Sequence, residues 1–203
     1  MSVIDLGRLL RSATTAFVIG CRVNQMDHPS FGGLVRVPLQ NGTCIYGLIY
    51  DIHIDDDGLV RQLITAEDVD ENIIADNRLN RNIPLEMSVL TVGYSKSGRI
   101  YHLLPPVPPL SLDRIYLCDP AELCSFIQAG HFGYFRHILR SQDAPVSELL
   151  AAHLQQAAQA QQEAGNREWV LAAVQELITL LRDDYPTLMS VLSAVGEATS
   201  ENQ

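Results

Sequence analysis

The side chains best suited to chemistry in this chain are six histidines and four cysteines, so their spacing decides which reactions the sequence could support. No two histidines have the HExxH spacing of a zinc helix. His131 and His137 lie six residues apart, which does not place them on one helical face. The complete set is His28, His53, His102, His131, His137, His153, Cys21, Cys44, Cys118 and Cys124. The cysteines form no CxxC pair, and we interpret them as buried free thiols rather than metal ligands or a disulfide. We therefore predict no metal site and no cofactor.

Asp51 and His53 are the one pair whose spacing would suit proton transfer. Two residues apart in an alternating run, they should share a face of a strand and could form an acid–base pair. The wet face of a strand produces the same spacing, and we favour that interpretation. No GxSxG motif and no distinctive arrangement of cysteine with histidine is present. We expect no catalytic residues. The alternative is a small-molecule enzyme with a site between strands and helices, around His53, His102 and His131.

The cationic side chains are few. The formal net charge is −10 and Lys96 is the one lysine. Residues 1–118 carry 10 Lys/Arg and 13 Asp/Glu, whereas residues 119–203 carry 4 and 11. Because nucleic-acid binding depends on cations that displace counterions from phosphates, this composition disfavours direct nucleic-acid binding. The densest cationic spot is Arg78 with Arg81. Together with Arg99 they are our candidate contacts for an anion or a partner, although we favour a solvated loop as the explanation of residues 77–82.

The strands that must position these residues are indicated by β-branched, alternating runs. We expect six of them, at residues 13–23, 33–39, 43–54, 86–94, 99–104 and 114–118. Asn41 and Gly42 favour a hairpin, and Gly47 indicates a close approach of two backbones. Residues 59–84 are the least regular, with a short helix that Thr65 could cap. Six short strands separated by turns predict a closed β-barrel, because closure removes exposed strand edges.

From Asp119 the pattern changes to a helical period. Asp119, Pro120 and Glu122 are typical of a helix start. Helices are expected at residues 121–127, 131–139, 144–163 and 169–182 and from 186, with a loose tail from about residue 196. The predicted fold is thus a mainly β protein: a six-stranded closed β-barrel domain over residues 1–118 and an α-helical domain over residues 119–203. The sequence leaves open whether the helices pack on the barrel or on another chain. We find no signal peptide and no run of 18 apolar residues, so we expect a cytoplasmic protein without a membrane span.

The β-part resembles a known family in several ordered segments. They are the strand at 87–93, the turn and strand at 98–104, the Pro-rich segment 105–109, the strand at 115–117 followed by Asp119, Glu122 and Leu123, and the earlier pair of strands at 33–38 and 45–52. These segments are similar to the HAS barrel, the N-terminal barrel of HerA-type hexameric helicase-translocases and of ATP synthase subunits. The resemblance covers about residues 12–127.

The resemblance implies a barrel that organises a ring and docks partner proteins, while a following domain hydrolyses ATP. This chain lacks any GxxxxGK[ST] loop, so ATP hydrolysis is not implied. We expect a non-enzymatic assembly or protein-docking module, whose partner is itself or an ATPase. An accessory role in a DNA-processing HerA-type complex and the small-molecule enzyme are the alternatives.

Overall fold

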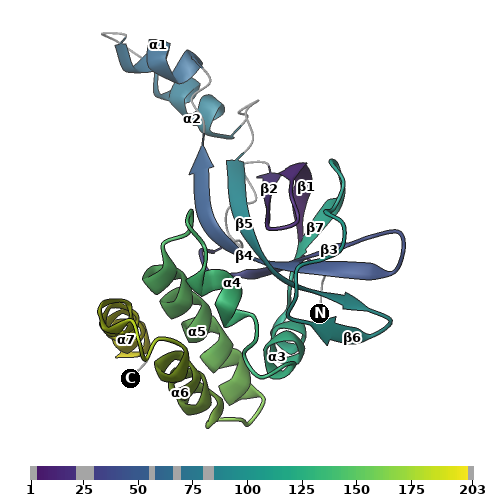
Figure 1. The fold of residues 1–203 in the computed structure, drawn as a ribbon. Coiled ribbons are helices and arrows are strands. Elements are labelled where there is room, and N and C mark those ends of the chain that lie inside the picture. Colours follow the sequence, from purple (N-terminus) through teal and green to yellow (C-terminus); the bar gives the residue numbers. More distant parts are fainter. Residues whose placement is uncertain (1–3, 22–29, 55–57, 66–69, 80–84, 201–203) are drawn as a thin grey trace.

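The strands form one antiparallel sheet that closes into a barrel. The computed structural model describes residues 4–21, 30–54, 58–65, 70–79 and 85–200. Its sheet has the order β2-β1-β7-β3-β4-β5-β6, and an additional pairing of β2 with β5 closes six strands into a barrel, while β6 is a seventh strand (Figure 1). The strands are β1 (Ile4–Ser12), β2 (Ala16–Cys21), β3 (Leu34–Pro38), β4 (Thr43–Ile54), β5 (Leu85–Lys96), β6 (Arg99–Tyr101) and β7 (Arg114–Leu117). The predicted six-stranded barrel followed by helices is confirmed.

The membership of the barrel differs from the prediction at one strand. β1 was not predicted, yet it lies between β2 and β7 and completes the wall. The register shifts twice along β1, between Asp5 and Gly7 and between Leu9 and Arg11, which breaks the alternation that identifies a strand in sequence. Conversely, the strand expected at residues 99–104 ends at Tyr101 and pairs with β5 alone.

Close contacts between backbones allow the barrel to close. A Cβ at Gly47 would lie 2.9 Å from the backbone carbonyl oxygen of Leu90 and 2.4 Å from a methyl group of Val89, so the expected close backbone approach is confirmed. The hairpin between β3 and β4 turns at Asn41 and Gly42 as predicted, with Gly42 at φ +77°. The barrel interior is filled by apolar side chains, among them Phe17, Ile19, Val37, Ile45, Ile49, Met87, Val89 and Ile115.

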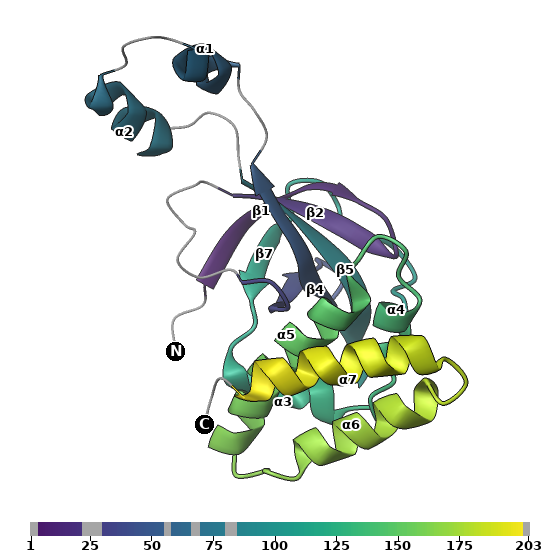
Figure 2. The same ribbon diagram turned by 90° about the vertical axis from the view of Figure 1, so that its left-hand side faces the viewer.

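A pair of short helices projects from one end of the barrel, between β4 and β5. These are α1 (Leu59–Thr65) and α2 (Glu71–Leu79), and both views show them away from the remaining elements (Figures 1 and 2). Thr65 is the last described residue of α1, and its hydroxyl donates to the carbonyl of Arg61. Residues 66–69, where the predicted cap would start a helix, lie outside the described part of the chain. The predicted loop at 77–82 is wrong at residues 77–79, which belong to α2. Residues 80–82 lie outside the described part of the chain.

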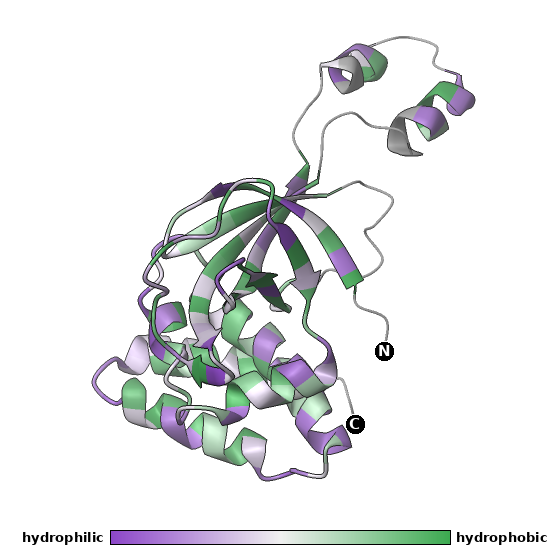
Figure 3. Cartoon of the chain, turned by 90° about the vertical axis from the view of Figure 1, so that its right-hand side faces the viewer, coloured by the Kyte–Doolittle hydropathy of each residue, from purple (hydrophilic) through white to green (hydrophobic). Residues whose placement is uncertain are grey.

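The remaining helices form two layers on the outside of the barrel. They are α3 (Pro120–Gln128), α4 (Phe135–Leu139), α5 (Val146–Glu163), α6 (Trp169–Leu180) and α7 (Tyr185–Ser200). Of these, α3, α4 and α5 lie against the barrel, and α6 and α7 pack on α5. One core joins Leu34, Leu48, Leu90 and Val92 of the barrel to the helices. Figure 3 shows hydrophobic stretches along both the strands and the helices. The helical region therefore packs on this chain's own barrel through α3, α4 and α5, across the predicted domain boundary at residue 118. The predicted loose tail is wrong up to Ser200, because α7 continues to that residue.

The start of α3 joins helix capping to a barrel contact. The carboxylate of Asp119 accepts from the backbone N–H of Glu122 at 2.9 Å, and the carboxylate of Glu122 accepts from the backbone N–H of Asp119 at 3.2 Å. This is the capping box that the sequence indicated. Glu122 also forms a 2.7 Å ion pair with Arg36 on β3, so the carboxylate that caps the helix also ties it to the barrel.

Candidate functional site: interaction surface and polar clusters

Two of the three predicted contact arginines lie on described elements that are far apart in the fold. Arg78 lies in α2, Arg81 lies outside the described residues, and Arg99 begins β6 with its guanidinium carbon 5.3 Å from the centre of the Tyr101 ring. α2 precedes the 12-residue strand β5 and β6 follows it, and at about 3.3 Å per residue this strand spans roughly 40 Å. Figure 1 shows α2 and β6 at opposite ends of the molecule. The chain therefore separates Arg78 from Arg99.

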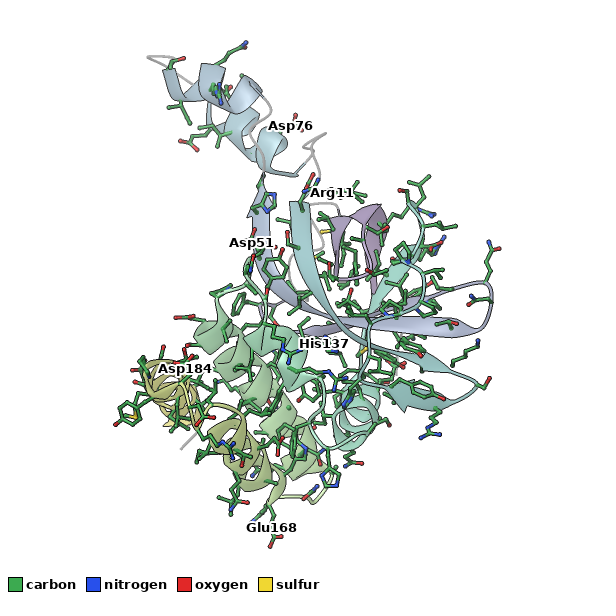
Figure 4. All side chains as sticks on the ribbon, in the orientation of Figure 1. Arg11, Asp51, Asp76, His137, Glu168 and Asp184 are labelled. Carbon is green, nitrogen blue, oxygen red and sulfur yellow. The ribbon has the colours of Figure 1, made fainter. Side chains whose placement is uncertain are left out.

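Asp51 and His53 do share one face of β4, and they form part of a surface ion-pair network. Nδ1 of His53 lies 3.0 Å from the carboxylate of Asp51, and Nε2 lies 3.8 Å from that of Glu86. Glu86 in turn lies 3.2 Å from the guanidinium of Arg11. Asp51 and Arg11 are labelled in Figure 4 near the end of the barrel that carries α1 and α2. The side chains of His53 and Asp51 are 37% and 53% exposed, which fits the wet strand face that we favoured.

His102 occupies a different place and is buried. Its Nε2 lies 3.0 Å from the carbonyl oxygen of Phe126, and burial lowers its pKa. Its own carbonyl oxygen accepts from the guanidinium of Arg136 and lies 3.2 Å from Nε2 of His137. His131 is exposed, whereas His53 lies on the surface of β4. His53 is therefore not brought to His102, because it lies beside Glu86 near the start of β5, whereas His102 follows β6 at the other end of that strand; His131 follows Gly130, which lies against the His102 ring.

His153 joins α5 to the barrel. It is fully buried, with Nδ1 3.3 Å from the carbonyl oxygen of Gly32 and Nε2 3.1 Å from the hydroxyl of Tyr134. Because a carbonyl oxygen can only accept, Nδ1 carries the proton and Nε2 accepts from Tyr134. Burial lowers the pKa of His153 to about 4, so the ring is neutral at pH 7. It acts as a structural link.

The cysteines are poorly suited to nucleophilic chemistry. All four are free thiols. Burial raises the pKa of Cys21 and of Cys44 to about 11, and it raises that of Cys118 well above its usual value. A thiolate is the reactive form, so these three thiols are unreactive at neutral pH. Among the described residues, no group of three histidine, cysteine, aspartate or glutamate side chains is arranged to hold a metal ion.

The segment after β6 presents an apolar surface that sequence analysis did not predict. Leu110 is 72% exposed, Leu112 is 66% exposed and the neighbouring Leu10 of β1 is 39% exposed. We call these three residues the leucine surface. The abundance of leucine beside four prolines was the available signal, but exposure cannot be read from composition.

Hydrogen bonds hold this segment firmly against β1. The backbone N–H of Leu112 donates to the carbonyl of Leu9 at 2.8 Å, and the N–H of Leu9 donates to the carbonyl of Asp113 at 3.0 Å. The hydroxyl of Ser12 donates to the carbonyl of Pro109, and the guanidinium of Arg8 donates to the carbonyl of Leu112. Since proline also fixes φ, the backbone that carries Leu110 and Leu112 is constrained on both sides.

A cavity of about 420 Å³ lies between the barrel and the region of α4. Its polar lining comes from Arg136, His137 and Arg140 of α4 and the residue after it, and from hydroxyl-bearing residues of the barrel. The sequence offered a signal that we did not use, because Arg136 and Arg140 are four residues apart and so share a helical face. Figure 4 places His137 between the barrel and the helices.

No helix in the described part of the chain has both the length and the hydropathy needed to cross a bilayer. Comparison with models of known protein families gives no match, and comparison with curated proteins gives none either.

Proposed function

We propose that the chain is a non-enzymatic assembly module, in which the leucine surface of one barrel contacts a second copy of the chain. The single observation that carries this proposal is the exposure of Leu110 and Leu112 on a segment fixed to β1. An apolar surface that is already ordered loses little conformational entropy on binding. The resemblance to the HAS barrel, which organises rings and docks partners, supports the same role.

The charge distribution favours contact through the barrel. The barrel half carries nearly balanced charge, with 10 Lys/Arg and 13 Asp/Glu, whereas residues 119–203 carry 4 and 11. Two copies that met through their helices would bring like charges together, which opposes association. Contact through the leucine surface leaves the acidic helices outside the interface. A partner ATPase, which the resemblance also implies, is the alternative occupant of the same surface.

The experiment is the absolute mass in solution, measured by light scattering coupled to size exclusion at two concentrations. We expect a mass that exceeds one chain, and a shift toward the monomer in the double variant Leu110→Ser, Leu112→Asn. Asparagine is chosen at position 112 because the backbone there has φ +71°, which asparagine tolerates.

The matched control is Leu171→Ser, which removes a leucine that is 62% exposed on α6. This variant should associate like the unmodified chain. A strictly monomeric unmodified chain at both concentrations refutes self-association. Binding of a purified ring ATPase by such a monomer, lost in the double variant, would assign the surface to that partner instead.

A further inference from the structure

We propose that the cavity beside α4 binds a small organic oxyanion, either a carboxylate or a phosphate monoester. The cavity measures about 420 Å³ and lies within the usual range of small-molecule sites. Arg136, His137 and Arg140 line it from α4 and its end, and Thr91 and Tyr50 line it from the barrel. No step of the proposed assembly function uses this cavity.

The charge of the lining is the main argument. Residues 119–203 contain four arginines against 11 acidic residues, and two of the four line this one cavity. Within the described ranges, neither Arg136 nor Arg140 forms an ion pair, although Asp143 lies in the same lining. The cavity thus has two guanidinium groups and one carboxylate, which leaves a net positive charge inside a strongly acidic chain.

The positions of the two arginines suit recognition of an anion. The guanidinium of Arg136 donates to the carbonyl oxygen of His102, which fixes its position. Arg140 is exposed and makes no side-chain hydrogen bond within the described residues. A planar guanidinium presents five N–H donors in a fork that matches carboxylate and phosphate oxygens, so both groups keep donors for a ligand.

The barrel side of the cavity adds further polar residues. Thr15, Tyr50 and Thr91 are among the residues that line it. Leu90, Leu104 and Tyr50 provide apolar lining. The combination fits an anionic group attached to a small apolar or aromatic body.

The test is isothermal titration calorimetry of the full chain with phenyl phosphate, with benzoate and with the uncharged analogue benzyl alcohol. We expect saturable binding of at least one anion with a dissociation constant of about 1 mM or tighter, and none of benzyl alcohol. Binding of phenyl phosphate alone assigns the site to phosphate esters, and binding of benzoate alone assigns it to carboxylates.

Two variants decide whether the binding occurs in this cavity. Arg140→Gln should weaken binding roughly tenfold or more, because it removes a charge-assisted contact. Arg167→Gln removes an exposed arginine between α5 and α6, outside the lining of the cavity, and should leave the affinity unchanged. Absence of saturable binding of both anions refutes the proposal, and so does equal weakening by the two variants.

Discussion

The buried imidazole of His153 makes a quantitative prediction for the pH dependence of stability. Burial lowers its pKa from an ordinary value of 6.5 to about 4 in the folded chain. The unfolded chain therefore takes up a proton at His153 that the folded chain excludes, between pH 6.5 and pH 4. Stability that depends on the neutral ring is fully present above pH 6.5 and falls as the pH falls toward 4.

The size of the effect follows from the two pKa values. Linkage between pH 7 and pH 5 gives a loss of about 2 kcal/mol from this one group, and the limit below pH 4 is about 3 kcal/mol. Other groups also titrate, including His102 and His137, whose pKa values burial lowers as well. A comparison with a variant that lacks only the ring at position 153 isolates its share.

The assay is urea unfolding at pH 7 and at pH 5 for the unmodified chain and for His153→Gln. The variant should be less stable at pH 7, because it loses the paired contacts to Gly32 and Tyr134. The decisive quantity is the change in free energy of unfolding between the two pH values, which should be smaller in the variant by about 2 kcal/mol.

His131→Gln, on an exposed side chain, is the matched control and should show the pH dependence of the unmodified chain. Equal changes in free energy for the unmodified chain and His153→Gln would refute the reasoning. If the variant does not fold, an NMR titration of the unmodified chain replaces it: a His153 ring that gains its proton near pH 6.5 without unfolding would contradict the buried neutral state.

Three further predictions concern packing, capping and thiol reactivity. Gly32→Ala should lower the free energy of unfolding by about 2–4 kcal/mol, because φ is +81° and the new Cβ would lie 2.8 Å from the Cβ of Ala152. Gly42→Ala, at φ +77° with no atom near the new Cβ, should lower the free energy of unfolding by about 1 kcal/mol in the same denaturant titration. Glu122→Ala should lower the free energy of unfolding by about 1–2 kcal/mol, because it removes the capping contact and the ion pair to Arg36. Glu122→Gln should lower it less, because an amide oxygen can still accept from the backbone N–H of Asp119. Equal losses of stability in the two variants would contradict this explanation. Labelling of the native chain with a thiol reagent should modify Cys124 before Cys21, because Cys21 is buried; Cys124→Ser should remove the fast phase, and a fast phase that persists would contradict the burial.

The parts of the fold that follow local rules could be predicted from the sequence. The hairpin at Asn41 and Gly42 follows from turn chemistry, and the start of α3 follows from the capping residues Asp119 and Glu122. The close approach at Gly47 follows from a glycine inside a strand. Each of these depends on one or a few adjacent residues, so their signal survives in a single sequence.

The missed elements depend on contacts between distant residues. β1 has two register shifts, and Gly7, at φ +136°, would place a Cβ 2.3 Å from the carbonyl oxygen of Gly20. Its strand conformation is stabilised by neighbours on both sides rather than by its own pattern. His102 was predicted to lie in a strand, but its Nε2 instead contacts the carbonyl oxygen of Phe126 in α3. Such tertiary contacts override local preference.

The candidate sites were harder to predict than the fold. We chose Arg78, Arg81 and Arg99 because cations are scarce in this chain. The scarcity of a residue type says nothing about where its side chains lie in the fold. Arg136 and Arg140 also belong to a region with few cations, but only the cavity that they line identifies them as candidate binding residues. The leucine surface likewise depends on exposure, which the sequence does not contain. The HAS-barrel relationship and the assembly role stay predictions.

The position of β1 in the barrel has a consequence for synthesis of the chain on the ribosome. β1 pairs with β7, and the ion pair between Asp5 and Arg114 joins residues 109 positions apart in sequence. During synthesis, one edge of β1 pairs with β2, but the other edge stays unpaired until β7, the last strand of the barrel, has been made. Until then, β1 and β2 expose unpaired strand edges, which favour aggregation. Nascent chains whose emerged part ends before residue 114 should therefore bind chaperones that recognise extended apolar segments, and chains whose emerged part includes β7 and the helices that cover the barrel should not.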